Sequence, residues 1–169
     1  MTLFESLTVT IMGVGAIIAL IQIGIGIRAL KADHERRKKQ ATIEYLNNLR
    51  TSYRNWNNEL IKKFGSDPIG VETANKIIED IESWAILKDM LGLFEHLAVG
   101  INTGVFDIDI LNKMAGQYLI DIYDRWKVYI NERRKDPKRQ NVYKDYEILV
   151  NRLNAIREKD DGVGRIRYS

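Results

Sequence analysis

The feature that most constrains this chain is an uncharged run near its N-terminus, since no Asp, Glu, Lys or Arg occurs from residue 6 to residue 27. The hydrocarbon core of a bilayer is about 30 Å thick, and a helix needs roughly 20 apolar residues to cross it at a rise of about 1.5 Å per residue. Residues 7–27 supply this length and predict a transmembrane helix. The alternative is a buried core helix of a soluble protein, which the length rule disfavours.

The charges that flank the run predict an uncleaved anchor. A signal peptide carries Lys or Arg before its apolar region, whereas this chain has Glu5 there. Lys and Arg collect on the cytoplasmic side of a span and contact anionic lipid. Cations follow this run and none precedes it: Arg28, Lys31, Arg36, Arg37, Lys38 and Lys39. We therefore predict a single-pass inner-membrane protein, with residues 1–6 outside and residues 28–169 in the cytoplasm.

Small and polar side chains recur along one face of the predicted span, at steps of three or four residues. They are Thr8, Met12, Gly15, Ala19, Gln22 and Gly26. Small residues let membrane helices approach closely, and a polar side chain in hydrocarbon needs a partner or water. A single span has no second span of its own to supply that partner, so the stripe predicts a homo-oligomer. Two arrangements stay open, a closed seam and a pore lining, and Gly and Ala are also common in membrane helices that have no such role.

After the span, apolar residues at helical spacing predict an all-α cytoplasmic region. No Gly or Pro interrupts residues 28–64, so the span is expected to continue as a juxtamembrane stalk helix that Gly65 ends as a C-cap. Further helices are expected over residues 72–99 with Thr73 as N-cap, from Asp107 to a charged stretch at residues 131–139, and over residues 142–158. Residues 65–158 thus predict an up-down helical bundle with little or no sheet, and residues 159–169 are expected to form a polar tail.

The composition offers little for catalysis. The chain has no Cys and two His, which excludes disulfides, thiolate zinc sites and Cys nucleophiles. No phosphate-binding Gly-rich loop, zinc-protease or serine-hydrolase motif occurs, and we expect no metal, no cofactor and no enzymatic activity. Arg28 and His34 match the spacing of the Arg and His of HEPN-class ribonucleases, so a divergent ribonuclease is a further alternative. Glu95 and His96 are adjacent on the helix expected over residues 72–99, and we expect a core or interfacial histidine paired with a carboxylate in preference to a ligand or catalytic residue.

A second basic cluster is predicted on the loop between the last two helices. Its members are Arg133, Arg134, Lys135, Lys138 and Arg139. Clustered cations attract phosphate groups, so an alternative function is a membrane-anchored binding module that senses RNA or a nucleotide through this loop. A solvated turn explains the cluster as well, and a net charge of +3 does not demand nucleic acid.

Four stretches together resemble a bacterial family of small membrane-anchored helical proteins that is catalogued as a domain of unknown function. They are residues 37–45, 84–104 and 114–116, and residues 129–130 with 133–134. This resemblance brings no catalytic residue. In build, the chain is also similar to the accessory membrane proteins of type VI CRISPR loci, which join one N-terminal span to a divergent HEPN-like bundle and assemble into pores during phage defence. That similarity implies a HEPN-like fold, a homo-oligomer that forms or gates a pore in antiviral defence, and a defence-system effector protein as partner.

Overall fold

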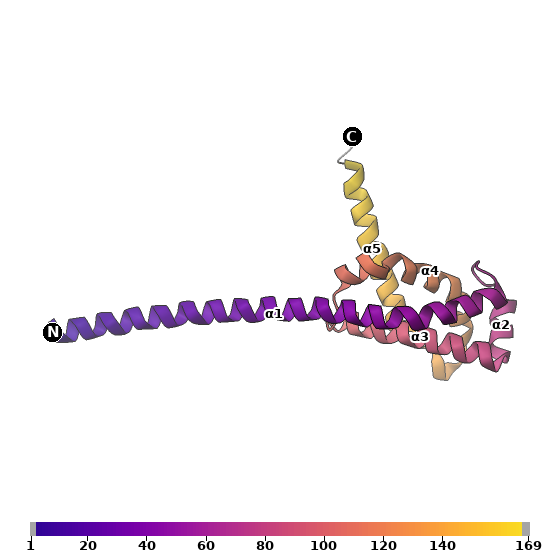
Figure 1. The fold of residues 1–169 in the computed structure, drawn as a ribbon, viewed down its shortest axis with the longest axis horizontal. Coiled ribbons are helices and arrows are strands. Elements are labelled where there is room, and N and C mark those ends of the chain that lie inside the picture. Colours follow the sequence, from indigo (N-terminus) through magenta and orange to yellow (C-terminus); the bar gives the residue numbers. More distant parts are fainter. Residues whose placement is uncertain (1–2, 167–169) are drawn as a thin grey trace. The chain divides into compact units, whose positions relative to one another are not determined.

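The computed structural model describes the backbone of residues 3–166 and the side chains of residues 18, 20–50 and 52–159. Its elements are α1 (Leu3–Phe64), α2 (Val71–Glu79), α3 (Ile81–Asn102), α4 (Ile108–Arg134), the 3-10 turn η1 (Pro137–Arg139) and α5 (Lys144–Ile166) (Figure 1). Residues 3–166 contain no strand, which confirms the prediction of an all-α fold. The chain divides into two compact units, residues 1–38 and residues 39–169, and each is described by itself.

Two helix ends lie where their capping residues predict them. α1 ends before Gly65, which adopts a φ of +81° and donates its backbone N–H to the carbonyl of Ile61 at 2.8 Å. A positive φ costs glycine little, so glycine is the favoured residue at this position. Asp107 caps α4, because its Oδ1 accepts hydrogen bonds from the backbone nitrogens of Asp109 and Ile110, both at 3.0 Å.

The single helix predicted over residues 72–99 is wrong. The helix is interrupted at Asp80, whose extended backbone (φ −87°, ψ 102°) separates α2 from α3. α2 begins at Val71 after Gly70, so Thr73 is not the N-cap. Asp80 forms an ion pair with Lys63 of α1. Apolar residues keep helical spacing across this break, which is why periodicity did not reveal it.

The remaining helix ends also differ from the predicted ones, most of all at the end of α5. α4 ends at Arg134, before η1, and α5 begins at Lys144 where residue 142 was expected. α5 also continues to Ile166, so most of the predicted polar tail has helical backbone. Differences of one or two residues at a helix end are common, whereas the extension of α5 from the expected residue 158 to Ile166 is a longer helix than the sequence predicted.

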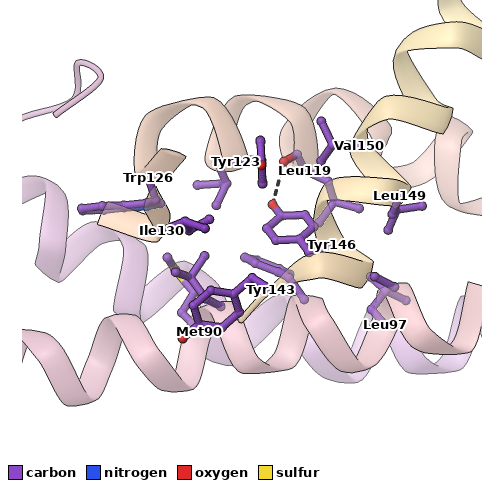
Figure 2. Packing of buried hydrophobic residues seen from close by; sticks show 14 of the residues in the cluster. Met90, Leu97, Leu119, Tyr123, Trp126, Ile130, Tyr143, Tyr146, Leu149 and Val150 are labelled. Atoms are coloured by element: carbon purple, nitrogen blue, oxygen red, sulfur yellow. Dashed lines mark hydrogen bonds between the residues drawn. The ribbon is translucent and has the colours of Figure 1, made fainter. Parts of the chain in front are cut away.

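The core of the second unit lies where α3, α4 and α5 pack together. Figure 2 shows Tyr146 of α5 among side chains of the other two helices, with its hydroxyl donating to the carbonyl of Leu119 at 2.6 Å. The rings of Phe94 and Tyr123 each lie 5.4 Å from the Tyr146 ring, centroid to centroid. Trp126 is fully buried in the same hydrophobic cluster. Each such side chain contributes about 1.5–3 kcal/mol through the apolar surface that it removes from water.

The part of α1 that belongs to the second unit packs against α3 and α4 through large rings and one buried hydroxyl. The Tyr53 ring lies 4.8 Å from that of Tyr118 and 5.9 Å from that of Phe94. Thr42 is fully buried, and its Oγ1 accepts a hydrogen bond from the backbone nitrogen of Asp107 at 2.8 Å. Residues 39–64 of the predicted stalk therefore share a compact unit with the bundle.

Candidate functional site

The described end of the predicted span exposes apolar side chains along α1. Seven are at least half exposed: Ile18, Leu20, Ile21, Ile23, Ile25, Ile27 and Leu30. Leu and Ile side chains on the inner faces of α3, α4 and α5 are, by contrast, buried. Soluble monomers rarely expose contiguous apolar patches beyond a few hundred Å². These side chains therefore mark a surface that fits lipid or a second helix.

The rest of the predicted span, residues 7–17 and Ala19, lies outside the described side chains. Among the described residues, no helix combines the length and the apolarity needed to cross a membrane.

The predicted stripe of small and polar residues is described at two of its six positions, Gln22 and Gly26, and both are exposed. Thr8, Met12, Gly15 and Ala19 lie outside the described side chains. A Cβ added at Gly26 would meet no atom within 4 Å, and the same holds at Gly24. No neighbouring atom among the described residues thus requires glycine at either position, which leaves room for a second helix to approach the backbone.

The cations that follow the predicted span lie on exposed helix surface. Arg28, Lys31, Arg36 and Arg37 are exposed in the first unit, where Lys38 is half-buried, and Lys39 is exposed in the second unit. The Arg37 Nε lies 2.8 Å from a carboxylate oxygen of Asp33, one turn away. These six cations face only two carboxylates in the same stretch of sequence, Asp33 and Glu35. The stretch keeps an excess of positive charge, which suits anionic lipid.

Arg28 and His34, which match the ribonuclease-type spacing, do not point toward a common site. Arg28 and His34 are both exposed on α1, and six residues of a regular helix place them about 120° apart around the axis. A phosphate held by one side chain would therefore lie away from the other, unless a second copy of the chain supplied the partner.

Carboxylates pair with most of the basic cluster between α4 and α5. Arg134 donates to the carbonyl of Val142 at 2.9 Å and to the Glu147 carboxylate at 2.7 Å. Lys135 forms an ion pair with Glu132 at 2.7 Å, and Arg139 forms one with Asp136 at 3.5 Å. The guanidinium of Arg133 lies 6.0 Å from the Trp84 ring centroid. Lys138 is exposed. Sensing of RNA or a nucleotide through this loop stays a prediction, and the local carboxylates weaken the field that would attract phosphate.

The Arg134–Glu147 contact predicts a pH dependence of stability. Hydrogen bonding to Arg134 lowers the pKa of Glu147 below its ordinary value of 4.5. A lowered pKa contributes stability above pH 4.5 that is lost as the pH falls through the folded-state value. Glu147→Gln should therefore reduce the free energy of unfolding at pH 7 by about 1 kcal/mol or less, since the pair is partly solvated.

Urea unfolding at several pH values checks this prediction. The difference between wild type and Glu147→Gln should shrink below pH 4.5. Glu72→Gln is the matched control, because Glu72 pairs with Lys76 on fully exposed surface and should change stability less. A difference that stays constant down to the acid transition would contradict the assigned contact.

Within the described chain, His96 is not the core or interfacial histidine, paired with a carboxylate, that the sequence predicted. The Glu95 carboxylate accepts hydrogen bonds from the backbone nitrogens of Tyr146, at 2.8 Å, and Asp145, at 3.2 Å, and thereby caps the first turn of α5. His96 is exposed beside Trp56 in a shallow cavity of about 350 Å³. Consecutive helix residues point about 100° apart, so Glu95 faces α5 while His96 faces solvent.

Sequence reasoning missed a polar groove between α1 and α4, the α1–α4 groove. Two cavities of about 260 and 410 Å³ share Tyr118 as a wall, and α1 lines them with Arg50, Tyr53, Arg54 and Asn57. These four residues recur at helical spacing, on one face of α1. That spacing could have predicted a polar face on this helix, but the apolar residues of the same helix give its main pattern. No group of three or more His, Asp or Glu side chains suited to a metal ion occurs among the described residues.

Comparison with known proteins gives a family and no function. No curated protein and no solved structure matches the chain. A family described as "Domain of unknown function (DUF4760)" matches residues 9–153. The match begins inside the uncharged run and ends in α5, so the N-terminal segment and the bundle are parts of one family pattern. The chain therefore belongs to the DUF4760 family.

Proposed function

We propose that this protein is a homo-oligomer anchored in the inner membrane, with the second unit in the cytoplasm and the N-terminal helices forming or gating a pore. The observation that carries the proposal is the series of exposed Ile and Leu side chains from Ile18 to Leu30. This series continues an uncharged sequence that begins at residue 6, and cations follow it from Arg28. Uncharged length followed by cations is the pattern of a single-pass anchor.

Association of the anchors is supported by Gln22 and Gly26. Lipid tails are as apolar as Leu, so membrane helices associate through close packing of small residues and through hydrogen bonds between polar side chains. Gly26 has open space around its Cα, and the Gln22 amide is costly in hydrocarbon until it finds a partner. A second copy of the same helix satisfies both.

In a pore, several Gln22 amides would line a water-filled path, whereas in a closed seam they would hydrogen-bond to one another. A ring of amides lowers the cost of a polar path through the bilayer, as polar linings do in known channels. A role in antiviral defence, with a defence-system effector as partner, rests on the architectural similarity alone and stays a prediction.

The proposal predicts that Gln22→Leu together with Gly26→Leu abolishes membrane depolarisation. The leucines remove the amide and fill the space through which the helices approach. Gly24→Leu is the matched control, because Gly24 has the same open space but lies about 200° around the helix from Gln22. A voltage-sensitive dye in expressing cells and conductance of proteoliposomes are the measurements.

Wild type and Gly24→Leu should depolarise, and the double variant should not, at equal amounts of protein in the membrane fraction. A wild-type protein that neither depolarises cells nor conducts in liposomes would contradict the pore. A double variant as active as wild type would contradict the assigned face.

A further inference from the structure

Two open grooves flank α1 in the second unit. On one side, residues of α1 and α4 line the smaller cavity of the α1–α4 groove, and Arg54 is among them. On the other side, Trp56 lines a shallow cavity together with α3, which we call the α1–α3 groove. Trp56 lies about 200° around the helix from Arg54, so the two grooves are on opposite sides of α1. The α3 residues of the α1–α3 groove are Lys88, Asp89, Gly92, Leu93 and His96.

The directions of the helices follow from their ring contacts and cavities. Tyr45 of α1 contacts Phe106, which follows α3, and Tyr53, further along α1, contacts Phe94 within α3. The α3 helix therefore runs opposite to α1. Later residues of α4 line the larger cavity together with later residues of α1, so α4 runs in the same direction as α1.

The two grooves lie at the same level along α1. The Tyr53 ring contacts both Tyr118 of α4 and Phe94 of α3, with centroid distances of 4.8 and 5.9 Å. Met114 precedes Tyr118 by four residues, which is about 6 Å of helix, and His96 follows Phe94 by two, which is about 3 Å. Because α3 and α4 run in opposite directions, both displacements point the same way. Met114 in one groove and His96 in the other thus lie within about 3 Å of one level.

The apolar surfaces of the two grooves differ in shape. Met114 is 47% exposed in the α1–α4 groove, and its unbranched thioether adapts to irregular surfaces. In the α1–α3 groove, Trp56 and Leu93 are half-buried. Between them is Gly92, where an added Cβ would meet no atom within 4 Å. A projecting Met on one side and an open Gly beside an aromatic ring on the other are complementary surfaces.

The charges of the two grooves are also complementary. Arg50 and Arg54 are exposed, neither forms an ion pair with a described residue, and no Asp or Glu lines their cavity. Asp89 is the carboxylate of the α1–α3 groove, and it too is exposed without an ion pair among the described residues. Lys88 of that groove lies 5.3 Å from the Trp84 ring centroid. One groove thus offers unpaired cations and the other an unpaired carboxylate.

A closed ring of more than two copies requires such a pair of different surfaces. In a ring, each copy contacts the next through two unlike faces that lie at the same level, one on each side of the subunit. The α1–α4 and α1–α3 grooves satisfy this requirement, because they lie on opposite sides of α1 at one level. Every residue that lines them belongs to the second unit.

We propose that the α1–α4 groove of one copy docks against the α1–α3 groove of the next. Met114 of one copy packs against Trp56 and Gly92 of its neighbour, and Arg54 lies beside the neighbour's Asp89. Apolar packing supplies the affinity, whereas the exposed charges select the register. The inference rests on the proposed homo-oligomer and names the contact that its second units make.

Disulfide cross-linking of the full-length protein in isolated membranes tests the proposal, because the natural chain has no Cys. With Met114→Cys and His96→Cys in one chain, oxidation by copper phenanthroline should give a ladder of dimers, trimers and larger species on a non-reducing gel. Either Cys alone should give few dimers, because the two faces are unlike. Met114→Cys with Asn151→Cys is the matched control, since Asn151 is exposed on α5 outside both grooves, and it should give no ladder.

Charge exchange in the Met114→Cys, His96→Cys chain is the second test. Arg54→Asp places two carboxylates together and Asp89→Arg places two or more cations together, so each alone should lower the cross-linked fraction several-fold. The two exchanges combined restore attraction and should recover most of the cross-linking. Circular dichroism should match in all of these chains, because Arg54 and Asp89 are exposed.

Three results overturn the proposal and leave the homo-oligomer standing. They are a wild type that is oligomeric by light scattering while the double-Cys chain forms no ladder, a single Cys that cross-links as well as the pair, and a combined charge exchange that recovers nothing. A monomeric wild type overturns both this contact and the proposed function.

Discussion

Replacing Ile18 and Ile21 by Lys is expected to move most of the protein from the membrane fraction to the soluble fraction. Both side chains are at least half exposed and lie near the middle of the predicted span. A Lys near the centre of a membrane helix costs about 2.5–3.5 kcal/mol on insertion. Two of them remove much of the free energy that the uncharged run supplies, so the anchor should fail while the second unit stays folded.

Ultracentrifugation of cell lysates, with alkaline extraction of the pellet, measures this prediction. Ile43→Lys is the matched control, because Ile43 is an exposed residue of α1 in the second unit and should not affect membrane binding. Circular dichroism of the released variant should retain strong helical signal. A double variant that stays in the pellet after alkaline extraction would show that residues 18 and 21 lie outside the bilayer.

Trp126→Ala is expected to lower the free energy of unfolding of the second unit by about 3–5 kcal/mol. The Trp126 side chain is fully buried in the hydrophobic core, and its removal leaves a cavity there. It also removes the ring on which the Arg125 guanidinium stacks. Domains of this size have only about 5–15 kcal/mol of stability, so the loss is a large part of the total.

Urea unfolding of the detergent-solubilised protein, followed by far-ultraviolet circular dichroism, measures the change. Trp126→Phe keeps an apolar ring in place and should cost less than half as much. Membrane fractionation should be unchanged in both variants, because neither alters the first unit. A Trp126→Ala variant whose unfolding midpoint matches wild type would contradict the packing of the core.

The helices of the second unit could be predicted because their ends and inner faces follow local rules. Asp107 and Gly65 act as caps through contacts with residues at most four positions away, and such contacts are visible in sequence. The break at Asp80 depends on tertiary structure, since its carboxylate pairs with Lys63 of another helix. Periodicity carries no information on such a partner.

The same limit applies to the candidate sites. The uncharged run and the cations after it are properties of the sequence, and their functional meaning could be stated before any fold was known. The role of Glu95 as a cap of α5 could not be predicted from the sequence, because the nitrogens that it binds lie about 50 residues further along the chain. The α1–α4 groove was hidden for the same reason, since Arg50 and Arg125 line neighbouring cavities only after α1 and α4 pack together.

The mass of the detergent-extracted protein, measured by light scattering with correction for bound detergent, tests the central claim most directly. The account predicts a discrete homo-oligomer in wild type and in Gly24→Leu, and a shift to smaller species in Gln22→Leu with Gly26→Leu. A wild-type protein that is monomeric in several detergents would contradict association through the N-terminal helix, and with it the pore.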